Sequence, residues 1–136
     1  KKKLNCIKKR QPWRPVAPIM TRETLSQFFE SNSDYRYMLF NPKVKKSKIK
    51  EIPAVIHIDG TSRVQTVTEE QNDKMYGLLK EFSKLSGIEM LCNTSLNIKE
   101  PIVDSPSDAL RTLKESNKAK YKIDFLVMGN YLIMNK

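Results

Sequence analysis

Four side chains that can form hydrogen bonds stand close together in the segment LCNTSLN, residues 91–97. They are Asn93, Thr94, Ser95 and Asn97, and the segment contains no Gly. Hydroxyl and amide groups can donate hydrogen bonds to anionic oxygens without carrying a full charge. An ordinary Asx or Ser turn also produces such a segment, so these residues alone leave both interpretations open.

Cationic side chains form the second group that could do chemistry. Lys8, Arg10 and Arg14 lie within seven residues, next to a Pro-rich segment, and Arg63 is predicted to share one face of a strand with Gln65. An arginine presents a planar fork of donors that fits a phosphate or a carboxylate. Cations facing neutral donors suit phosphoryl or acyl-phosphate chemistry, in which catalysis is mainly positioning and charge stabilisation.

The composition narrows the possible partners. At 136 residues the chain is expected to form one domain, residues 1–136, and its net charge of +10 favours either a solvated basic surface or an anionic partner. One histidine and two cysteines offer almost nothing to a zinc site or a Ser-His-Asp hydrolase, so no metal site is predicted. The chain shows no apolar run of the roughly 20 residues that a membrane span needs, and no signal peptide. Cys6 and Cys92, read as free thiols, indicate a cytoplasmic protein.

Strands and helices are predicted to alternate along the chain, which indicates an α+β fold with helices covering a mixed sheet. The first half of the chain is predicted to contain an extended segment 15–20, a helix 21–31 capped by Thr21, a strand 34–40 and a hairpin 54–67 that turns at Asp59-Gly60. A helix 68–87 follows, with a Thr68/Gln71 capping box and an apolar stripe of Met75, Leu78, Leu79, Phe82 and Leu85. The remaining predicted elements are a strand 88–92, a helix 105–116 capped by Ser105, and a hairpin 124–135 that turns at Gly129-Asn130.

Three further residues each have a structural and a functional interpretation. A two-residue Asp59-Gly60 turn places His57 away from Arg63 as a packed core residue, whereas a three-residue loop reverses its side. Trp13 is either a core anchor or a platform for adenine. Cys92 is interpreted as a small buried hydrophobic residue rather than a nucleophile.

Three segments, IKKRQPWRPVAP, IPAVIHIDGTSRVQTV and NTSLNIKEPIVDSPSDAL, resemble in order and spacing the C-terminal domain of the O-carbamoyltransferases. That family includes the nodulation-factor, cephamycin and tobramycin carbamoyltransferases, and the resemblance covers residues 4–133. It implies a YrdC-like fold, an open twisted sheet with helices packed on it. It also implies that carbamoyl phosphate and ATP, with Mg²⁺, are converted to carbamoyl adenylate.

The resemblance further implies a preceding N-terminal transferase domain as partner. That domain, of the sugar-kinase/actin type and carrying a metal, would transfer the carbamoyl group to a hydroxyl acceptor that the sequence does not identify. The chain itself is expected to be the C-terminal part of such an enzyme.

The site residues implied by the resemblance match two short motifs and three single positions. A Lys-x-Arg pair corresponds to Lys8 and Arg10, and a Ser-x-Asn pair corresponds to Ser95 and Asn97. The carbamoyltransferase pattern adds Arg14, Arg63 and Asn93, with Lys8 and Arg63 in the catalytic role. All seven are expected to bind nucleotide and carbamoyl phosphate around one cavity.

The sequence departs from the family pattern in three places. Gln11 stands where members usually have Glu, Leu96 replaces a usual Phe, and the loop before Glu100 lacks a Gly and is one residue shorter. The competing hypotheses are a YrdC-like RNA-binding module without catalysis and an inert interaction domain. Nucleic acid is disfavoured as a partner because no alternation of aromatic and basic residues recurs.

Overall fold

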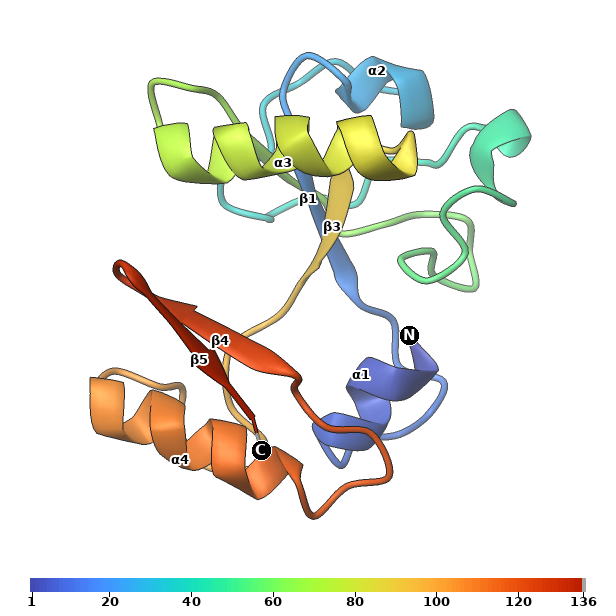
Figure 1. Cartoon of the computed structure of the whole chain (residues 1–136). Helices are drawn as coiled ribbons and strands as arrows, with labels where there is room; N and C mark the ends of the chain where they lie inside the picture. Colours follow the sequence, from blue (N-terminus) through green and yellow to red (C-terminus); the bar gives the residue numbers. More distant parts are fainter. Residues whose placement is uncertain (136) are drawn as a thin grey trace. The chain divides into compact units, whose positions relative to one another are not determined.

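The structure, a computed structural model, describes residues 1–135 and falls into two compact units (Figure 1). Unit 1 consists of Lys1–Arg14 and Ser95–Lys136, and unit 2 consists of Pro15–Thr94. Both units contain helices and strands, so the predicted α+β class is confirmed. The assignment of residues 1–136 to a single domain stays a prediction.

A three-stranded mixed sheet forms the centre of unit 2. Its strands are β1 (Ala17–Thr21), β2 (Gln65–Val67) and β3 (Met90–Asn93), in the order β2-β1-β3. The central strand β1 runs parallel to β2 and antiparallel to β3. The predicted extended segment 15–20 and the predicted strand 88–92 correspond to β1 and β3, so both are confirmed.

Helices surround the sheet of unit 2. They are α2 (Leu25–Phe28), the short 3₁₀ helix η1 (Lys46–Lys48) and α3 (Asp73–Ser86), and Figure 1 shows α3 running across β1 and β3. Leu25, Phe28 and Phe29 join Met20 and Met90 in the buried core of this unit. Leu25, Phe28 and Phe29 were predicted to share one side of a helix. Leu25 and Phe28 lie in α2 and Phe29 follows its last residue, and burial of these side chains stabilises a very short helix.

Unit 1 contains the remaining regular elements. They are α1 (Lys2–Ile7), α4 (Pro106–Ser116) and the antiparallel pair β4 (Phe125–Met128) and β5 (Tyr131–Met134). Ser105 caps α4 by accepting a hydrogen bond from the backbone of Asp108 (3.2 Å), and Pro106 occupies the first helical turn. The predicted helix 105–116 and hairpin 124–135 are therefore confirmed, whereas α1 was not predicted.

The predicted strand 34–40 is wrong. Met38 adopts a left-handed backbone conformation with φ of 57°, and its N–H bonds back to the carbonyl of Tyr35 at 3.1 Å. Tyr37, Leu39 and Phe40 are exposed, so no sheet neighbour covers the apolar residues of the alternating pattern. The period-two pattern therefore marks a turn and an exposed segment here, because a strand needs a partner that the fold does not supply.

The predicted hairpin 54–67 is also wrong, although its turn exists. His57 donates its backbone N–H to the carbonyl of Thr61 (2.8 Å), which closes a loop of three residues around Gly60. The segment before this loop forms turns rather than a strand, and regular strand structure begins only at Gln65. As a result Arg63 lies before β2 and not within it.

Two predicted helices begin later than expected. Thr21 ends β1 and its hydroxyl contacts Glu89 and Thr24, so it does not cap a helix. Thr68 and Gln71 form a turn in which the Gln71 side chain accepts from the Thr68 N–H (3.2 Å), but Asn72 is the residue that caps α3. Gly87 ends α3 as predicted, with φ of 76°.

The predicted apolar stripe of α3 is only partly buried. Leu79 is fully buried, whereas Leu78, Phe82 and Leu85 are exposed to solvent. The helical spacing was correct, but a three-stranded sheet is too narrow to cover the whole stripe. Only the residue that reaches the centre of the sheet is enclosed.

Candidate functional site

Lys8 lies at the centre of a polar cluster in unit 1. Its side-chain amino group donates to the carbonyl oxygens of Ser95 (2.6 Å) and Asn97 (2.8 Å), and to the Asn97 Oδ1 (2.9 Å). The Ser95 hydroxyl lies at 3.4 Å. Lys8 of the predicted Lys-x-Arg pair is thus brought together with both residues of the predicted Ser-x-Asn pair, which lie almost ninety positions away in the sequence.

The side chains of this loop donate to other groups of the same loop. Ser95 Oγ donates to Asn97 Oδ1 (2.7 Å), and Asn97 Nδ2 donates to the carbonyl of Glu100 (2.7 Å). The segment also bends after β3, so positions 93, 95 and 97 do not continue as one extended strand. The expected row of neutral donors is therefore replaced by local turn bonds, the alternative left open by the sequence.

Arg10 is positioned by a buried asparagine that the sequence analysis missed. Asn5 of α1 accepts from Arg10 Nε (2.6 Å) and donates to the carbonyls of Pro12 (3.1 Å) and Arg14 (2.8 Å). Among residues 1–135, Arg10 Nη2 is the one buried side-chain nitrogen or oxygen without a hydrogen-bond partner. A buried donor left unpaired lowers the stability of the folded chain by about 1–3 kcal/mol. A hydrogen bond from this nitrogen to an acceptor on a ligand would remove that cost.

Burial and neighbouring charges change the pKa values of two cations in this cluster. Burial lowers the pKa of Lys8, the positive charges of Arg10 and Arg14 lower it further, and the carboxylate of Glu100 opposes this effect. Burial and the charge of Arg14 likewise lower the pKa of Arg10. An anionic ligand would relieve the repulsion among these three cations.

Glu100 stabilises the loop that holds Lys8. Its carboxylate accepts from the backbone N–H groups of Ile98 (3.0 Å) and Lys99 (2.9 Å) and from the hydroxyl of Thr112 (2.9 Å). Hydrogen bonds from its own backbone N–H and from those of Lys99 and Ile98 lower the pKa of Glu100 to about 2. The shortened loop therefore remains well ordered around a fixed carboxylate.

Unit 2 holds the other predicted residues. Asn93 lines a polar cavity of about 490 Å³ together with Arg36, Gln65 and the first turn of α3. Arg63 is exposed, and among the described residues it has no hydrogen bond or ion pair. Because these two residues belong to unit 2, the prediction that all seven side chains share one cavity stays a prediction.

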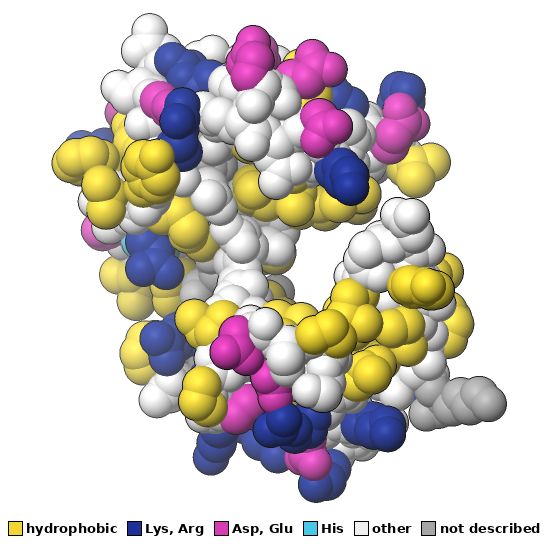
Figure 2. Space-filling model, turned by 90° about the vertical axis from the view of Figure 1, so that its left-hand side faces the viewer, with side chains coloured by type: hydrophobic (Ala, Val, Ile, Leu, Met, Phe, Trp, Pro, Cys, Tyr) yellow, Lys and Arg dark blue, Asp and Glu magenta, His cyan; other side chains and the backbone are white. Residues whose placement is uncertain are grey.

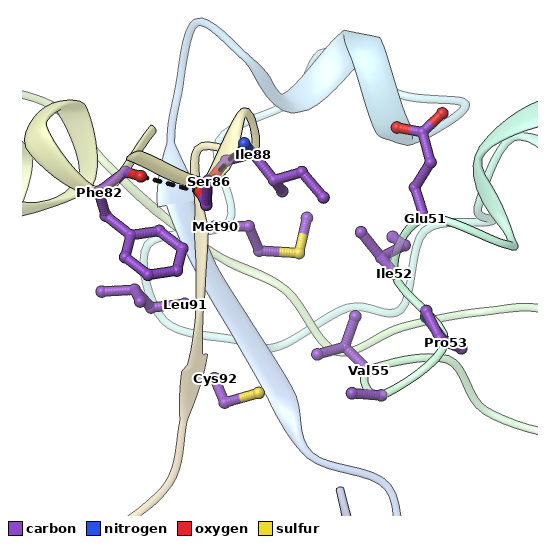
Figure 3. Close-up of a pocket in the computed structure, with 11 residues that line it drawn as sticks. Glu51, Ile52, Pro53, Val55, Phe82, Ser86, Ile88, Met90, Leu91 and Cys92 are labelled. Atoms are coloured by element: carbon purple, nitrogen blue, oxygen red, sulfur yellow. Dashed lines mark hydrogen bonds between the residues drawn. The ribbon is translucent and has the colours of Figure 1, made fainter. Parts of the chain in front are cut away.

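An apolar pocket of unit 2 is distinct from the predicted residues (Figure 3). It has a volume of about 240 Å³ and is formed by residues 51–55, by α3 and by β3. The Ser86 hydroxyl at its edge donates to the carbonyl of Phe82 (2.8 Å), so it contributes to the end of α3. Cys92 also lines the pocket but is exposed, which corrects the prediction of a buried residue.

Of the alternatives left open for His57, the three-residue loop is the one that forms, and neither His57 nor Trp13 is a buried core residue. His57 is half-buried, and its Nδ1 lies 3.1 Å from the hydroxyl of Thr61 within the three-residue loop. Trp13 is 72% exposed, so it is not a core anchor. Its alternative role as a platform for adenine stays a prediction.

A comparison with known protein families shows which family this chain belongs to. A family model described as "Carbamoyltransferase C-terminus" matches residues 1–135. The chain belongs to this carbamoyltransferase family. The three segments around Lys8, Arg63 and Ser95 on which the resemblance is based lie within the matched region. The predicted family is therefore confirmed.

Individual relatives of the carbamoyltransferase C-terminal chain agree with this assignment. "Nodulation protein NolNO" of Sinorhizobium fredii is 39% identical over 141 residues, covering 100% of this chain and 20% of the relative. "Nodulation protein NolO" of Bradyrhizobium diazoefficiens is 36% identical, covering 96% of this chain and 24% of the relative. A "3'-hydroxymethylcephem-O-carbamoyltransferase" of Amycolatopsis lactamdurans is 40% identical, covering 78% and 20%.

The carbamoyltransferase C-terminal chain spans about a fifth of the length of the curated relatives that it matches. The remaining length of those relatives is consistent with the predicted N-terminal partner domain. In the described part of the chain, no helix has both the length and the apolar character that crossing a bilayer requires.

Proposed function

We propose that this chain binds carbamoyl phosphate and ATP and forms carbamoyl adenylate within a larger O-carbamoyltransferase. The observation that carries the proposal is the buried, unpartnered Nη2 of Arg10, beside the buried cation of Lys8. An anionic phosphate oxygen would satisfy the free donor and reduce the repulsion among Lys8, Arg10 and Arg14. The YrdC-like architecture and a cytoplasmic location belong to the same proposal.

Each cation would act differently. The hydrogens of the Lys8 ammonium are taken by loop oxygens, so Lys8 would supply a fixed positive charge below the ligand. Arg10 would donate directly, because its Nη2 is free. Arg14, which is exposed in unit 1, would reach toward a phosphate oxygen as the ligand binds. Arg63, which is exposed in unit 2, keeps the phosphate-binding role that the resemblance implies.

Mg²⁺ would accompany the nucleotide rather than occupy a protein cage. Residues 1–135 contain no group of three or more His, Cys, Asp or Glu side chains that could hold a metal ion. Mg²⁺ is commonly held by substrate phosphates and water with few protein ligands. The metal-bearing N-terminal domain would then transfer the carbamoyl group to a hydroxyl acceptor.

Replacing the free guanidinium donor tests this proposal. Arg10→Lys keeps the charge but removes the fork, so the affinity for ATP and carbamoyl phosphate should fall about 10- to 100-fold, the value of one charge-assisted hydrogen bond. The measurement is calorimetric titration of the chain with each ligand in the presence of Mg²⁺. In the activation step, water would cleave carbamoyl phosphate to carbamate and phosphate, and a carbamate oxygen would displace pyrophosphate from the α-phosphorus of ATP. Release of both phosphate and pyrophosphate that depends on carbamoyl phosphate would report this step.

Arg111→Lys provides the matched control. Arg111 is exposed on α4 and pairs with Asp108, so the same substitution there should leave both affinities unchanged. A folded wild-type chain that binds neither ATP nor carbamoyl phosphate contradicts the proposed function. Equal losses in the Arg10 and Arg111 variants contradict the role of Arg10.

The charge of +10 supports a second candidate, an RNA-binding module. Such a module would bind through many phosphates, whereas the proposed site around Lys8 and Arg10 would bind one nucleotide. The two candidates differ in their dependence on salt.

A further inference from the structure

Helix α1 ends in a turn whose hydrogen bonds are those of a Schellman motif. The N–H of Arg10 donates to the carbonyl of Asn5 (3.0 Å), and the N–H of Lys9 donates to the carbonyl of Cys6 (3.1 Å). These bonds satisfy two carbonyls at the end of the helix, which the helix itself leaves without partners. The motif requires a left-handed residue at the position of Lys9, and Lys9 adopts that conformation with φ of 49°.

A lysine is an unusual residue at this position of the turn. Glycine is the residue most often found there, because a side chain is strained in the left-handed conformation. Among residues 1–135, Lys9 and Met38 are the only residues other than glycine with a positive φ. The Lys9 side chain is exposed and has no hydrogen bond or ion pair with the described residues, so it does not itself hold the turn. Other contacts must therefore offset the strain.

Asn5 supplies those contacts. It is buried, with 2% of its surface exposed. Its Nδ2 donates to the carbonyls of Pro12 (3.1 Å) and Arg14 (2.8 Å), at the end of a second turn that is closed by a bond from the Arg14 N–H to the carbonyl of Gln11 (3.1 Å). Its Oδ1 accepts from Arg10 Nε (2.6 Å). One side chain thus ties the whole segment after α1 back to the helix.

The orientation of the Asn5 amide is fixed by its partners. A backbone carbonyl can only accept a hydrogen bond, and the Nε of an arginine can only donate one. The two carbonyls therefore face Nδ2 and the guanidinium faces Oδ1, because the reversed amide would set acceptors against acceptors and a donor against donors. The side chain of Asn5 has no alternative arrangement in this turn.

The bond from Nε determines where the rest of the Arg10 guanidinium lies. The group is planar, so fixing the Nε–H also fixes the directions of its other nitrogens. Asn5 occupies Nε, whereas Nη2 is buried and has no hydrogen-bond partner among residues 1–135. An arginine loses rotamer freedom when it binds a ligand, and holding it in place beforehand reduces that loss. The turn at Lys9 and the amide of Asn5 would therefore raise the affinity of Arg10 for an acceptor.

We propose that Asn5 and Lys9 are positioning residues for phosphate binding, which hold Arg10 Nη2 in its binding orientation before the ligand arrives. The inference rests on the proposed function, in which an oxygen of ATP or carbamoyl phosphate accepts from this nitrogen. All three residues belong to unit 1. The middle residue of the Lys-x-Arg pair would thus act through its backbone conformation and not through its charge.

Two substitutions of Lys9 separate conformation from charge, because both remove the same positive charge. Lys9→Gly favours the left-handed conformation, and it should also raise the melting temperature. Lys9→Val disfavours that conformation because valine is β-branched, so Arg10 would be held correctly in a smaller fraction of molecules. We expect Lys9→Val to bind ATP about fivefold more weakly than Lys9→Gly, as measured by calorimetric titration of folded samples in the presence of Mg²⁺.

A double-mutant cycle tests whether Asn5 acts through Arg10. Asn5→Ala removes the partner of Arg10 Nε and should lower the affinity for ATP about tenfold, the value of one charge-assisted hydrogen bond. In the Arg10→Ala background the same substitution should change the affinity by less than about twofold, because no guanidinium is left to orient. A merely structural role would give the same loss in both backgrounds. Asn41→Ala, at an exposed position of unit 2, is the matched control and should leave the affinity unchanged.

The outcomes separate the inference from the proposed function. Equal affinities of Lys9→Gly and Lys9→Val, or equal losses from Asn5→Ala with and without Arg10, overturn the inference and leave the proposed function in place. Failure of the folded wild-type chain to bind ATP overturns the proposed function, and the inference with it. If Asn5→Ala does not fold, the comparison of the two Lys9 variants decides alone. Weaker binding by Lys9→Val, with a loss from Asn5→Ala that disappears without Arg10, supports the inference.

Discussion

Glu100 shows how one carboxylate can organise a loop. It accepts two backbone hydrogen bonds from Ile98 and Lys99 and one from Thr112, and its own carbonyl accepts from Asn97. Through Asn97 this arrangement extends to Lys8, whose ammonium group bonds the same loop. Through the loop, the carboxylate therefore supports the position of Lys8.

Glu100→Gln should lower the free energy of unfolding by about 1–3 kcal/mol at pH 7, because the amide replaces an acceptor-only group among N–H donors. The folded-state pKa of about 2 is below the ordinary value, so the carboxylate stabilises the fold above about pH 4.5. That contribution is lost as the pH falls from about 4.5 towards 2. Urea denaturation at several pH values should show the wild type and the variant converging over this range.

Glu69→Gln is the matched control for this pH dependence. Glu69 is exposed and has no hydrogen bond among the described residues, so its substitution should change stability little at any pH. A difference in the free energy of unfolding between wild type and Glu100→Gln that stays constant from pH 7 to pH 3 would contradict the stabilising role of the ionised carboxylate.

At the scale of elements, the ends of helices are set by local chemistry. Ser105 caps α4, Asn72 caps α3, and Gly87 closes α3 in the left-handed conformation. These bonds form between residues within a few positions of one another, which is why short sequence patterns predict them. The predicted start of α3 was wrong because Thr68 and Asn72 can both cap a helix, and in the structure Asn72 is the residue that does so.

Two glycines of the same helix should respond in opposite directions to the same substitution. Gly87→Ala should destabilise the chain by about 1 kcal/mol, because a side chain at φ of 76° is strained. Gly77→Ala, inside α3, should stabilise it by about 0.5–1 kcal/mol through helix propensity. A methyl group would meet no heavy atom within 4 Å at either position, so packing does not complicate the comparison.

Chemical denaturation of the two variants measures these effects. A loss of stability in Gly77→Ala similar to that in Gly87→Ala would contradict the conformational explanation, since only Gly87 has a positive φ.

At the scale of the whole molecule, the positive charge is widely distributed. Figure 2 shows Lys and Arg side chains scattered among acidic and hydrophobic side chains on the face that it draws. Several lysines are also paired with acidic neighbours, including Lys80 with Glu89 and Lys84 with Glu81. A net charge of +10 spread in this way favours general attraction of anions, whereas a specific anion site around Lys8 and Arg10 is what we propose.

Salt dependence should separate a nucleotide pocket from a nucleic-acid surface. Duplex DNA binding weakens with a slope of about 0.9 in log K per log unit of salt for each phosphate neutralised. We expect the affinity for ATP to change little between 50 and 200 mM KCl, because few charges are exchanged, and to depend on the adenine ring. Titrations with ATP, with tripolyphosphate and with a short RNA across this range provide the measurement.

Two results would favour the nucleic-acid interpretation over the proposed function. One is tight RNA binding with a steep salt slope that ATP does not compete away. The other is equal affinity for ATP and tripolyphosphate, which would show that the base is not recognised.

The sequence by itself determined the elements whose signals lie close together in the chain. Helix 105–116 follows from Ser105 and Pro106, and the hairpin 124–135 follows from Gly129 between two apolar runs. The family motifs also predicted that Lys8 would meet Ser95 and Asn97, because their spacing matched a known pattern. The prediction of a strand at 34–40 was wrong because alternation of polar and apolar residues does not by itself supply a neighbouring strand.

Only the tertiary structure decided the direction of each hydrogen bond and the burial of each charge. Whether Asn93 donates or accepts depends on Gln65, 28 residues away, and on the backbone of Arg36 beyond it. The role of Asn5 in orienting Arg10, and the burial that leaves Arg10 Nη2 free, likewise require the folded chain. Hydrogen-bond direction is a property of partners in space, and an amide or a hydroxyl in a sequence has no direction until those partners are in place.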